Sequence, residues 1–269
     1  MKKLVELYCE LPLAVRKPLW KVWHKLIIDF DKSKSNTFMN YGYAALDNSY
    51  DTIKLEDADK HDLYSLQLYD FVVRNLDLTG KNVLEVGSGR GGGASYITRY
   101  KKPKSYTAVD ISQQVMDFCT NFHNVEGLKF VKGDAENLPF PDNSFDVIVN
   151  VESARCYPSI PNFFAQVNRL LKQDGEFRFT DMIKPKDVAS IRTMIDAAGF
   201  TIIEEINIRQ NVVKALQLNS DAIKGTIDKR IPKFLRKSFY EFAGVVGSNR
   251  YSIFADGDME YWSFILRKK

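Results

Sequence analysis

The chain has 269 residues, 45% of them hydrophobic, and a formal net charge of +4 at pH 7. This length suits one doubly wound domain with additions, and the mild positive charge gives no indication of a nucleic-acid partner. Its three cysteines are far apart and odd in number, which argues against a disulfide framework and for a reducing compartment. No apolar run suits a membrane span or a signal peptide, so we expect a cytoplasmic protein.

Residues 1–75 are expected to form a helical cover over the core and a lid over a ligand. Residues 1–30 carry apolar side chains at helical spacing with prolines between them, which predicts two helices. Their excess of Lys and Arg suits a basic amphipathic segment that rests peripherally on an anionic membrane, or one that covers the core with solvated lysines. The aromatic-rich residues 36–43 suit a lid over a ligand, with Tyr41 as a candidate cofactor contact, or a surface turn anchored by tyrosines. Residues 59–75 predict a further helix.

The next segment, residues 76–210, begins with a glycine-rich loop. The apolar run 82–86 predicts a buried parallel strand, and a helix is expected from about residue 92 to residue 100. Glycines let the backbone turn tightly, so the free N–H groups of the loop and the positive end of the helix would face a small molecule. Gly87, Gly89 and Gly92 also fit the dinucleotide-binding pattern G-x-G-x-x-G. The candidate cofactor contacts here are Glu85, Gly87, Gly89 and Gly91.

Acidic side chains follow the next two predicted strands. Strand 105–109 ends at Asp110, whose carboxylate can accept from both hydroxyls of a ribose, and Ile111 belongs to the same candidate site. Strand 128–131 leads to Asp134 and Ala135, which are placed to meet an adenine through a carboxylate and a backbone N–H. Each piece alone has a simpler explanation, because such loops are often only turns and such aspartates only helix caps. Together they favour a nucleoside cofactor.

The remaining elements complete an α/β fold. Strand 145–151 opens onto residues 150–158, the expected reaction edge, with Asn150 as a further cofactor contact. Helix 160–172, strand 176–181, helix 187–198 and strand 201–209 follow. The pattern of residues 211–257 predicts a two-helix cap over a substrate pocket. This segment carries a second cluster of Lys and Arg, after the one in residues 1–30, and most of its charges are expected to form a solvated face. Residues 258–269 are expected to form a closing strand. We expect a Rossmann-like doubly wound sheet, mostly parallel with an antiparallel last strand, plus an N-terminal helical cover and a helical cap inserted before the last strand.

From Glu85 to Asp181 this ordered set resembles the class I S-adenosylmethionine-dependent methyltransferases. A narrower resemblance, from about Asp62 onward, is to the phthiotriolone and phenolphthiotriolone dimycocerosate methyltransferases. It is carried by residues 91–96, 133–140, 150–158, 234–236 and 242–245. The resemblance implies S-adenosylmethionine as cofactor with S-adenosylhomocysteine as product, no metal, no nucleic acid, and a hydrophobic lipid, polyketide or terpenoid substrate. It also allows a homo-oligomer.

The sequence departs from that family at the reaction edge. The family usually carries His before Cys-Tyr-Pro, as the suspected proton acceptor for an alcohol, whereas this chain has Arg155. A guanidinium stays protonated and cannot serve as a base. The candidates for proton removal are therefore Glu152, which we favour, Tyr157, and His24 of the N-terminal cover. Alternatively, Glu152 only holds Arg155 in an ion pair.

Several functions remain open at this point. O-methylation of a hydroxyl is favoured. In C-methylation of a prenyl or terpenoid alkene, Glu152 would remove the later proton and Arg155 would pair with a diphosphate or carboxylate. A non-catalytic cofactor-binding module is a third reading. A nicotinamide dehydrogenase is disfavoured because no Tyr-x-x-x-Lys pair is suitably placed, and a base methyltransferase because no Asn-Pro-Pro-Tyr follows the fourth strand.

Overall fold

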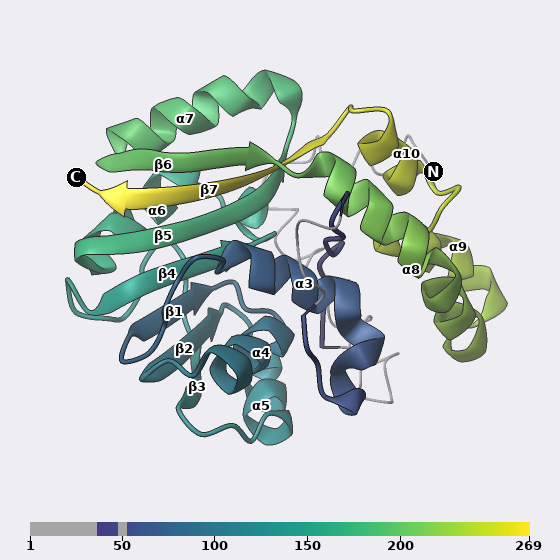
Figure 1. The fold of residues 1–269 in the computed structure, drawn as a ribbon, viewed down its shortest axis with the longest axis horizontal. Helices are drawn as coiled ribbons and strands as arrows, with labels where there is room; N and C mark the ends of the chain where they lie inside the picture. Colours follow the sequence, from purple (N-terminus) through teal and green to yellow (C-terminus); the bar gives the residue numbers. More distant parts are fainter. Residues whose placement is uncertain (1–36, 48–52) are drawn as a thin grey trace.

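The computed structural model describes residues 37–47 and 53–269, so the helices expected in residues 1–30, and His24, lie outside the described residues. A seven-stranded sheet with the order β3-β2-β1-β4-β5-β7-β6 forms the centre of the molecule (Figure 1). Its β7 runs antiparallel to both neighbours, and the other described pairs are parallel. The expected sheet is thus confirmed. The strands are β1 Asn82–Val86, β2 Ser105–Asp110, β3 Leu128–Lys132, β4 Phe145–Val151, β5 Leu171–Ile183, β6 Phe200–Asn207 and β7 Glu260–Lys268.

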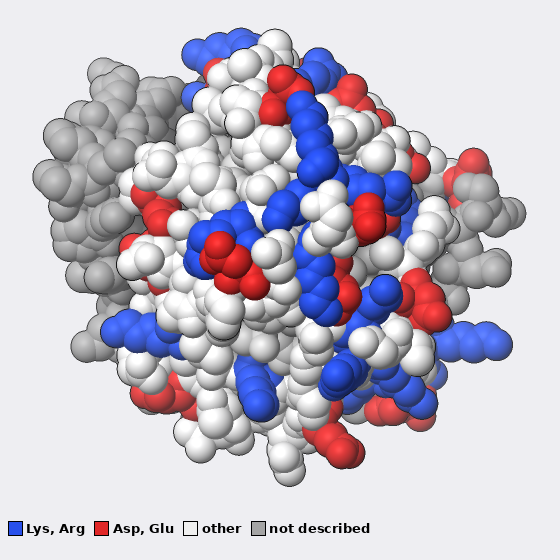
Figure 2. Space-filling model, turned by 90° about the vertical axis from the view of Figure 1, so that its left-hand side faces the viewer, with Lys and Arg blue, Asp and Glu red and all other residues white. Residues whose placement is uncertain are grey.

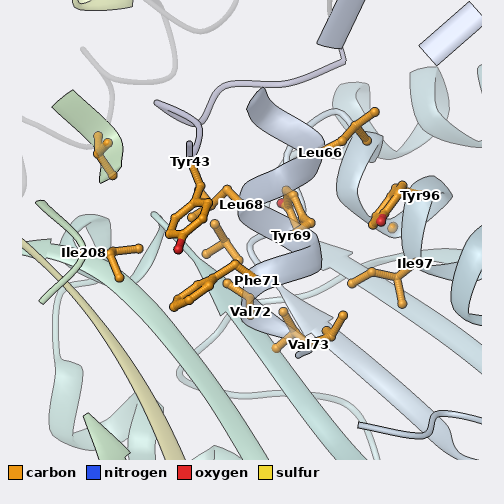
Figure 3. Close-up of a cluster of buried hydrophobic side chains, with 14 of the residues drawn as sticks. Tyr43, Leu66, Leu68, Tyr69, Phe71, Val72, Val73, Tyr96, Ile97 and Ile208 are labelled. Atoms are coloured by element: carbon orange, nitrogen blue, oxygen red, sulfur yellow. The ribbon is translucent and has the colours of Figure 1, made fainter. Parts of the chain in front are cut away.

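Alternate residues of the central strands face two separate apolar cores, as the pleat of a sheet requires. Val83 and Val147 face the core that contains side chains of α3, α4 and α8, whereas Leu84 and Ile148 face the core that contains side chains of α6 and α7. Figure 3 shows the first core, in which the apolar side chains of α3 contact Tyr43 and the side chains of α4. The helices are α3 Leu63–Val72, α4 Gly92–Lys101, α5 Gln113–Phe122, α6 Ile160–Leu170 and α7 Val188–Ala197, with α8 Arg209–Arg230, α9 Lys233–Ala243 and α10 Asn249–Ala255 in the cap.

Three short 3-10 helices complete the described elements: η1 Asp57–Asp62, η2 Ala154–Cys156 and η3 Pro185–Asp187. The helix expected over residues 59–75 is therefore divided between η1 and α3. Among residues 37–47 and 53–269, no helix combines the length and apolar character needed to cross a bilayer.

The end of α6 and the make-up of the cap differ from the sequence prediction. The helix expected to reach residue 172 ends at Leu170, because Leu171 is fully buried and pairs with Phe145 at the start of β5. The expected two-helix cap has three helices. Gly244 ends α9 in a left-handed conformation, and Ser248 begins α10 by accepting a hydrogen bond from the Tyr251 N–H at 3.1 Å.

The face at which β7 ends carries mixed charge. Figure 2 shows Lys and Arg side chains interspersed with Asp and Glu there. Lys172 pairs with Asp146 and Arg267 with Glu176, both at 3.0 Å. Pairs of this kind in water contribute little to stability, so this surface is an ordinary solvated face.

Candidate functional site

The glycine-rich loop joins β1 to α4 in a backbone conformation that favours glycine. Gly87, Gly89 and Gly91 have φ angles of 79°, 52° and 77°. A Cβ at Gly87 would lie 2.2 Å from Ser153 Oγ, and one at Gly89 would lie 2.8 Å from the Met39 methyl carbon. The loop is therefore closely approached from two sides, by the end of β4 and by the segment that was expected to form a lid.

Most N–H groups of this loop have partners within the protein, which contradicts the expectation that they are free. Gly87 and Ser88 donate to the Val109 carbonyl at 2.8 and 3.0 Å, and Gly92 donates to the Thr37 carbonyl at 3.3 Å. The physical reason is that β2 runs alongside the loop, while residues 37–39 lie over the start of α4. A contact between this loop and a small molecule therefore stays a prediction.

The side chains at the ends of β2 and β3 come to the same edge of the sheet. The two oxygens of Asp110 accept hydrogen bonds from the Gly89 and Ser112 N–H groups, each at 3.1 Å. Ile111 is 51% exposed. Asp134 is exposed and accepts from the Glu136 N–H at 3.0 Å, whereas the adjacent Ala135 is buried. Because β2 and β3 are adjacent and parallel, these residues form one ledge beside the loop.

Glu85 lies within β1 and is buried. Its carboxylate oxygens accept hydrogen bonds from the Tyr69 hydroxyl at 2.9 Å and the Tyr106 hydroxyl at 3.0 Å. Burial raises the pKa of Glu85 to about 7, although the two tyrosine hydroxyls oppose the shift. Both oxygens thus have internal partners, and a direct contact between Glu85 and a cofactor stays a prediction.

A second hydrogen-bonded group lies at the end of β4, against Gly87. Asn150 Nδ2 donates to the Val86 carbonyl at 2.9 Å and to Ser153 Oγ at 2.7 Å, and Ser153 Oγ lies 2.9 Å from the Tyr157 hydroxyl. Burial raises the pKa of Tyr157, so this phenol is neutral at physiological pH. The role that its contacts support for Tyr157 is to hold the loop and β4 together, rather than to accept a proton.

Glu152 immediately follows β4 and has an unusual backbone. Its φ of 54° lies in the left-handed region, which is uncommon for a residue with a side chain and is often retained at functional sites. Its Oε1 accepts hydrogen bonds from the Tyr41 N–H at 2.8 Å and the Tyr261 hydroxyl at 2.5 Å. Burial raises the pKa of Glu152 to about 7, with Arg155 as the main opposing influence.

Arg155 pairs with Asp181 more closely than with Glu152. Its Nη1 lies 2.8 Å from Asp181 Oδ1, whereas the closest approach of its guanidinium to the Glu152 carboxylate is 3.8 Å. The Arg155 backbone N–H also donates to Asp181, at 3.1 Å. About a third of the Arg155 side chain remains exposed, so the guanidinium can meet a ligand while Asp181 holds it.

Three buried polar atoms at this edge have no hydrogen-bond partner among the described residues. They are Ser88 Oγ, Asn150 Oδ1 and Glu152 Oε2. Buried polar atoms are nearly always paired in folded proteins, so an unpaired group of them indicates a place where a ligand or water binds. All three lie at the carboxyl ends of β1 and β4, which are adjacent in the sheet. Sequence reasoning missed Ser88, although it stands between two of the loop glycines.

The roof over Glu152 comes from the cap and the 37–47 segment. The Tyr41 hydroxyl donates to the Phe242 carbonyl of α9 at 3.3 Å, and its ring packs edge-on against Phe254 of α10 at 5.1 Å. Tyr41 was predicted as a cofactor contact. Its described contacts are instead with Glu152 and the cap, so the cofactor contact stays a prediction. Tyr261, which sequence reasoning missed, is fully buried at the start of β7.

Searched over residues 37–47 and 53–269, the structure contains no group of three or more His, Cys, Asp or Glu side chains that could hold a metal ion. The ledge, the loop and the unpaired oxygens would instead suit an organic ligand with both polar and flat apolar parts. Such a ligand site, at the carboxyl edge of a Rossmann-like sheet, is typical of nucleotide- and nucleoside-dependent enzymes.

Comparison with known proteins narrows this class to methyltransferases. Residues 84–179 match the family described as methyltransferase domain. Two solved structures share the fold. The [4+2]-cyclase SpnF has a TM-score of 0.67 and 20% identity, and the match covers 91% of this chain and 93% of the other. A putative sarcosine dimethylglycine methyltransferase from Galdieria sulphuraria has a TM-score of 0.65 and 17% identity, and the match covers 87% of this chain and 93% of the other. One of the two is a cyclase by name, so the fold alone does not define the chemistry.

The relatives in sequence are more specific. The phthiotriol/phenolphthiotriol dimycocerosates methyltransferase of Mycobacterium tuberculosis is 35% identical over 252 residues, which cover 94% of this chain and 93% of the relative. The fatty-acid O-methyltransferase of Mycolicibacterium smegmatis is 38% identical over 205 residues, which cover 76% and 74%. The chain belongs to the phthiotriol/phenolphthiotriol dimycocerosates methyltransferase family, and it is a methyltransferase.

Proposed function

We propose that this protein transfers the methyl group of S-adenosylmethionine to a hydroxyl oxygen of a hydrophobic, lipid- or polyketide-like molecule. The names of the relatives support a lipid substrate. The observation that carries the choice of a hydroxyl is Glu152 Oε2, which is buried at the end of β4 beneath the cap, has no hydrogen-bond partner among the described residues and lies 3.8 Å from the Arg155 guanidinium. A hydroxyl must lose its proton during transfer, and a positioned carboxylate can accept it.

The proposed cofactor site runs along the carboxyl edge of β1, β2 and β3. Asp110 would accept hydrogen bonds from the ribose, and Asp134, the Ala135 N–H and the exposed Ile111 side chain would meet the adenine. The loop of Gly87, Gly89 and Gly91 would pass close to the remainder, beside Asn150 Oδ1 and Ser88 Oγ. When bound, S-adenosylmethionine supplies a methyl group on a sulfonium centre, which is already activated for transfer. The residues of this chain then have to orient the acceptor, exclude water and take up one proton.

The contacts of Glu152 suit the last of these tasks. Tyr41 and Tyr261 both donate to Oε1, which fixes the carboxylate, whereas Oε2 accepts no hydrogen bond and has only the Arg155 guanidinium at 3.8 Å, so it could accept the proton of the substrate. A pKa near 7 leaves about half of the carboxylate ionised at neutral pH, close to the optimum for a general base. Because only the ionised form accepts a proton, the rate should rise as the pH increases through about 7.

A second candidate is O-methylation of a fatty-acid carboxylate. The partly exposed Arg155 favours it, because a guanidinium held by Asp181 can pair with an anionic group of the substrate. One relative carries this activity in its name. A carboxylate has no proton to lose, so this reaction would not need Glu152 as a base. Under this alternative Arg155→Leu should raise KM far more than it changes cofactor affinity.

The experiment mixes purified protein and radiolabelled S-adenosylmethionine with either a hydroxylated lipid extract or a mixture of fatty acids. Under the proposal, label appears as an ether on the hydroxylated lipid, and Glu152→Gln lowers kcat by about 10²–10⁴-fold. The exposed Glu126→Gln serves as the matched control and should leave kcat unchanged. Label found only on fatty acids, with Glu152→Gln still active, would favour the second candidate. Label found only on carbon would overturn both O-methylation candidates and favour C-methylation of an alkene.

A further inference from the structure

The corner between α8 and α9 exposes a large apolar side chain. Phe234, in the first turn of α9, is 82% exposed, the highest value among the large hydrophobic side chains of the described residues. Its neighbour Leu235 packs against a small apolar cluster that includes Ile227 and Ile231 of the same corner. Phe234 therefore projects from a corner that already has its own core, and folding of the cap does not require it to be apolar.

Positive charge surrounds this side chain. Residues 224–237 contain six Lys or Arg and one Asp. That one acid, Asp228, is engaged within the cap by Arg236 at 3.1 Å and by the Tyr240 hydroxyl at 2.5 Å. Lys229, Lys233 and Lys237 are exposed. The mixed charges of Figure 2 lie on a different face of the molecule.

The same helix reaches the roof of the proposed active site. Phe242, whose carbonyl accepts from the Tyr41 hydroxyl, lies eight residues after Phe234 on α9. At 1.5 Å per residue, about 12 Å of helix separates the exposed tip from the roof over Glu152. A surface that binds this corner would therefore lie within a few helical turns of the roof over Glu152.

We propose that the α8–α9 corner docks the protein on an anionic lipid surface, with Phe234 inserted at the interface and the three lysines against the headgroups. An exposed aromatic side chain surrounded by cations suits such a surface for two reasons. The aromatic ring gains free energy by leaving water for the apolar interface, and the cations are attracted to the anionic headgroups. Capture of a membrane-dissolved substrate rests on the proposed function above, but the docking itself does not.

The test is co-sedimentation of the full chain with vesicles, measured without any methylation assay. The protein should bind vesicles of phosphatidylcholine mixed with phosphatidylglycerol, should bind poorly to pure phosphatidylcholine, and should be released by salt. Phe234→Ser should weaken binding about tenfold or more. The triple variant Lys229→Gln, Lys233→Gln, Lys237→Gln should weaken it on the order of 100-fold.

Matched controls separate docking from general effects. Phe122→Ser removes another exposed phenylalanine, on α5, and Lys81→Gln, Lys104→Gln, Lys129→Gln removes three exposed lysines away from the cap. Both should bind vesicles like the parent protein. The proposal is overturned if Phe234→Ser binds vesicles as well as the parent protein does, or if the parent protein does not bind them. So does a change of oligomeric state in Phe234→Ser with unaltered vesicle binding, because a second copy of the chain would then cover this corner.

A separate measurement keeps this result independent of the catalytic proposal. With a detergent-dispersed acceptor, the Phe234 and triple-lysine variants should retain parental kcat, because neither change touches Glu152 or the ledge. Loss of vesicle binding with retained turnover supports docking. Absence of turnover in every protein would count against the proposed function while leaving the vesicle result to stand by itself.

Discussion

The buried carboxyl of Glu85 gives the sharpest quantitative prediction. Glu85→Gln keeps the shape of the side chain, and an amide can still hydrogen-bond to the hydroxyls of Tyr69 and Tyr106. It removes the ability to titrate. The variant therefore tests the ionisation of one group while its packing stays nearly unchanged.

The magnitude follows from the pKa. Burial raises the pKa of Glu85 from 4.5 to about 7 in the folded protein, and each pKa unit represents about 1.4 kcal/mol. Since the folded pKa is the higher one, the folded state holds the proton more tightly than the unfolded state. The resulting stabilisation is fully present below pH 4.5 and is lost as the pH rises through about 7. The parent protein should lose about 3 kcal/mol relative to Glu85→Gln across this window.

Urea unfolding followed by circular dichroism between pH 4.5 and pH 8 measures this difference. Other titrating groups, including Glu152, are present in both proteins and cancel in the comparison. The exposed Glu126→Gln is the control, and its difference from the parent protein should stay nearly flat with pH. A difference between parent and Glu85→Gln that is also independent of pH would refute the reasoning, since it would mean that Glu85 titrates at its ordinary pKa.

Three further outcomes are expected. Asp110→Ala should weaken S-adenosylhomocysteine binding by about 1.5–3 kcal/mol in calorimetry, through loss of a charge-assisted contact, and unchanged affinity would show that the ribose site is misplaced. Gly87→Ala should lower the free energy of unfolding by about 1–3 kcal/mol more than Gly80→Ala. Both glycines have left-handed φ angles, but only a Cβ at Gly87 would meet other side chains, those of Ser153 and Tyr157, so equal losses would show that this contact is not a clash. Tyr261→Phe removes a hydrogen bond that lowers the pKa of Glu152, so the rising limb of kcat should move to higher pH; a fixed limb would argue against Glu152 as the base.

Local sequence signals were sufficient for the sheet and for part of the site. The apolar runs, the loop glycines and the acidic strand ends are each readable within a few residues, and parallel strands bring their carboxyl ends to one edge. The positions of Asp110, Asp134 and Glu152 along that edge follow directly. Their roles toward a cofactor or substrate stay predictions that the experiments above address.

The environment of Glu152 could not be read from the sequence. Tyr41 and Tyr261 are 111 and 109 residues away from it in the chain. Tyr261 reaches it from β7, which lies between β5 and β6 in the sheet, and Tyr41 reaches it from the segment 37–47. The partners of Glu85 come from α3 and β2, and the Thr37 carbonyl that occupies the Gly92 N–H comes from a segment before α3. No local pattern specifies which of many tyrosines reaches a given carboxylate.

The amino-acid sequence by itself determined the order of strands and helices, the glycine-rich turn and the line of acidic side chains, because these depend on hydrophobic periodicity and on backbone preferences over short distances. Only the tertiary structure decided which of these groups are buried, paired or left with an open oxygen. Burial and pairing depend on segments brought together from across the chain, and they set the pKa values and the unpaired atoms from which the chemistry of Glu152 is inferred.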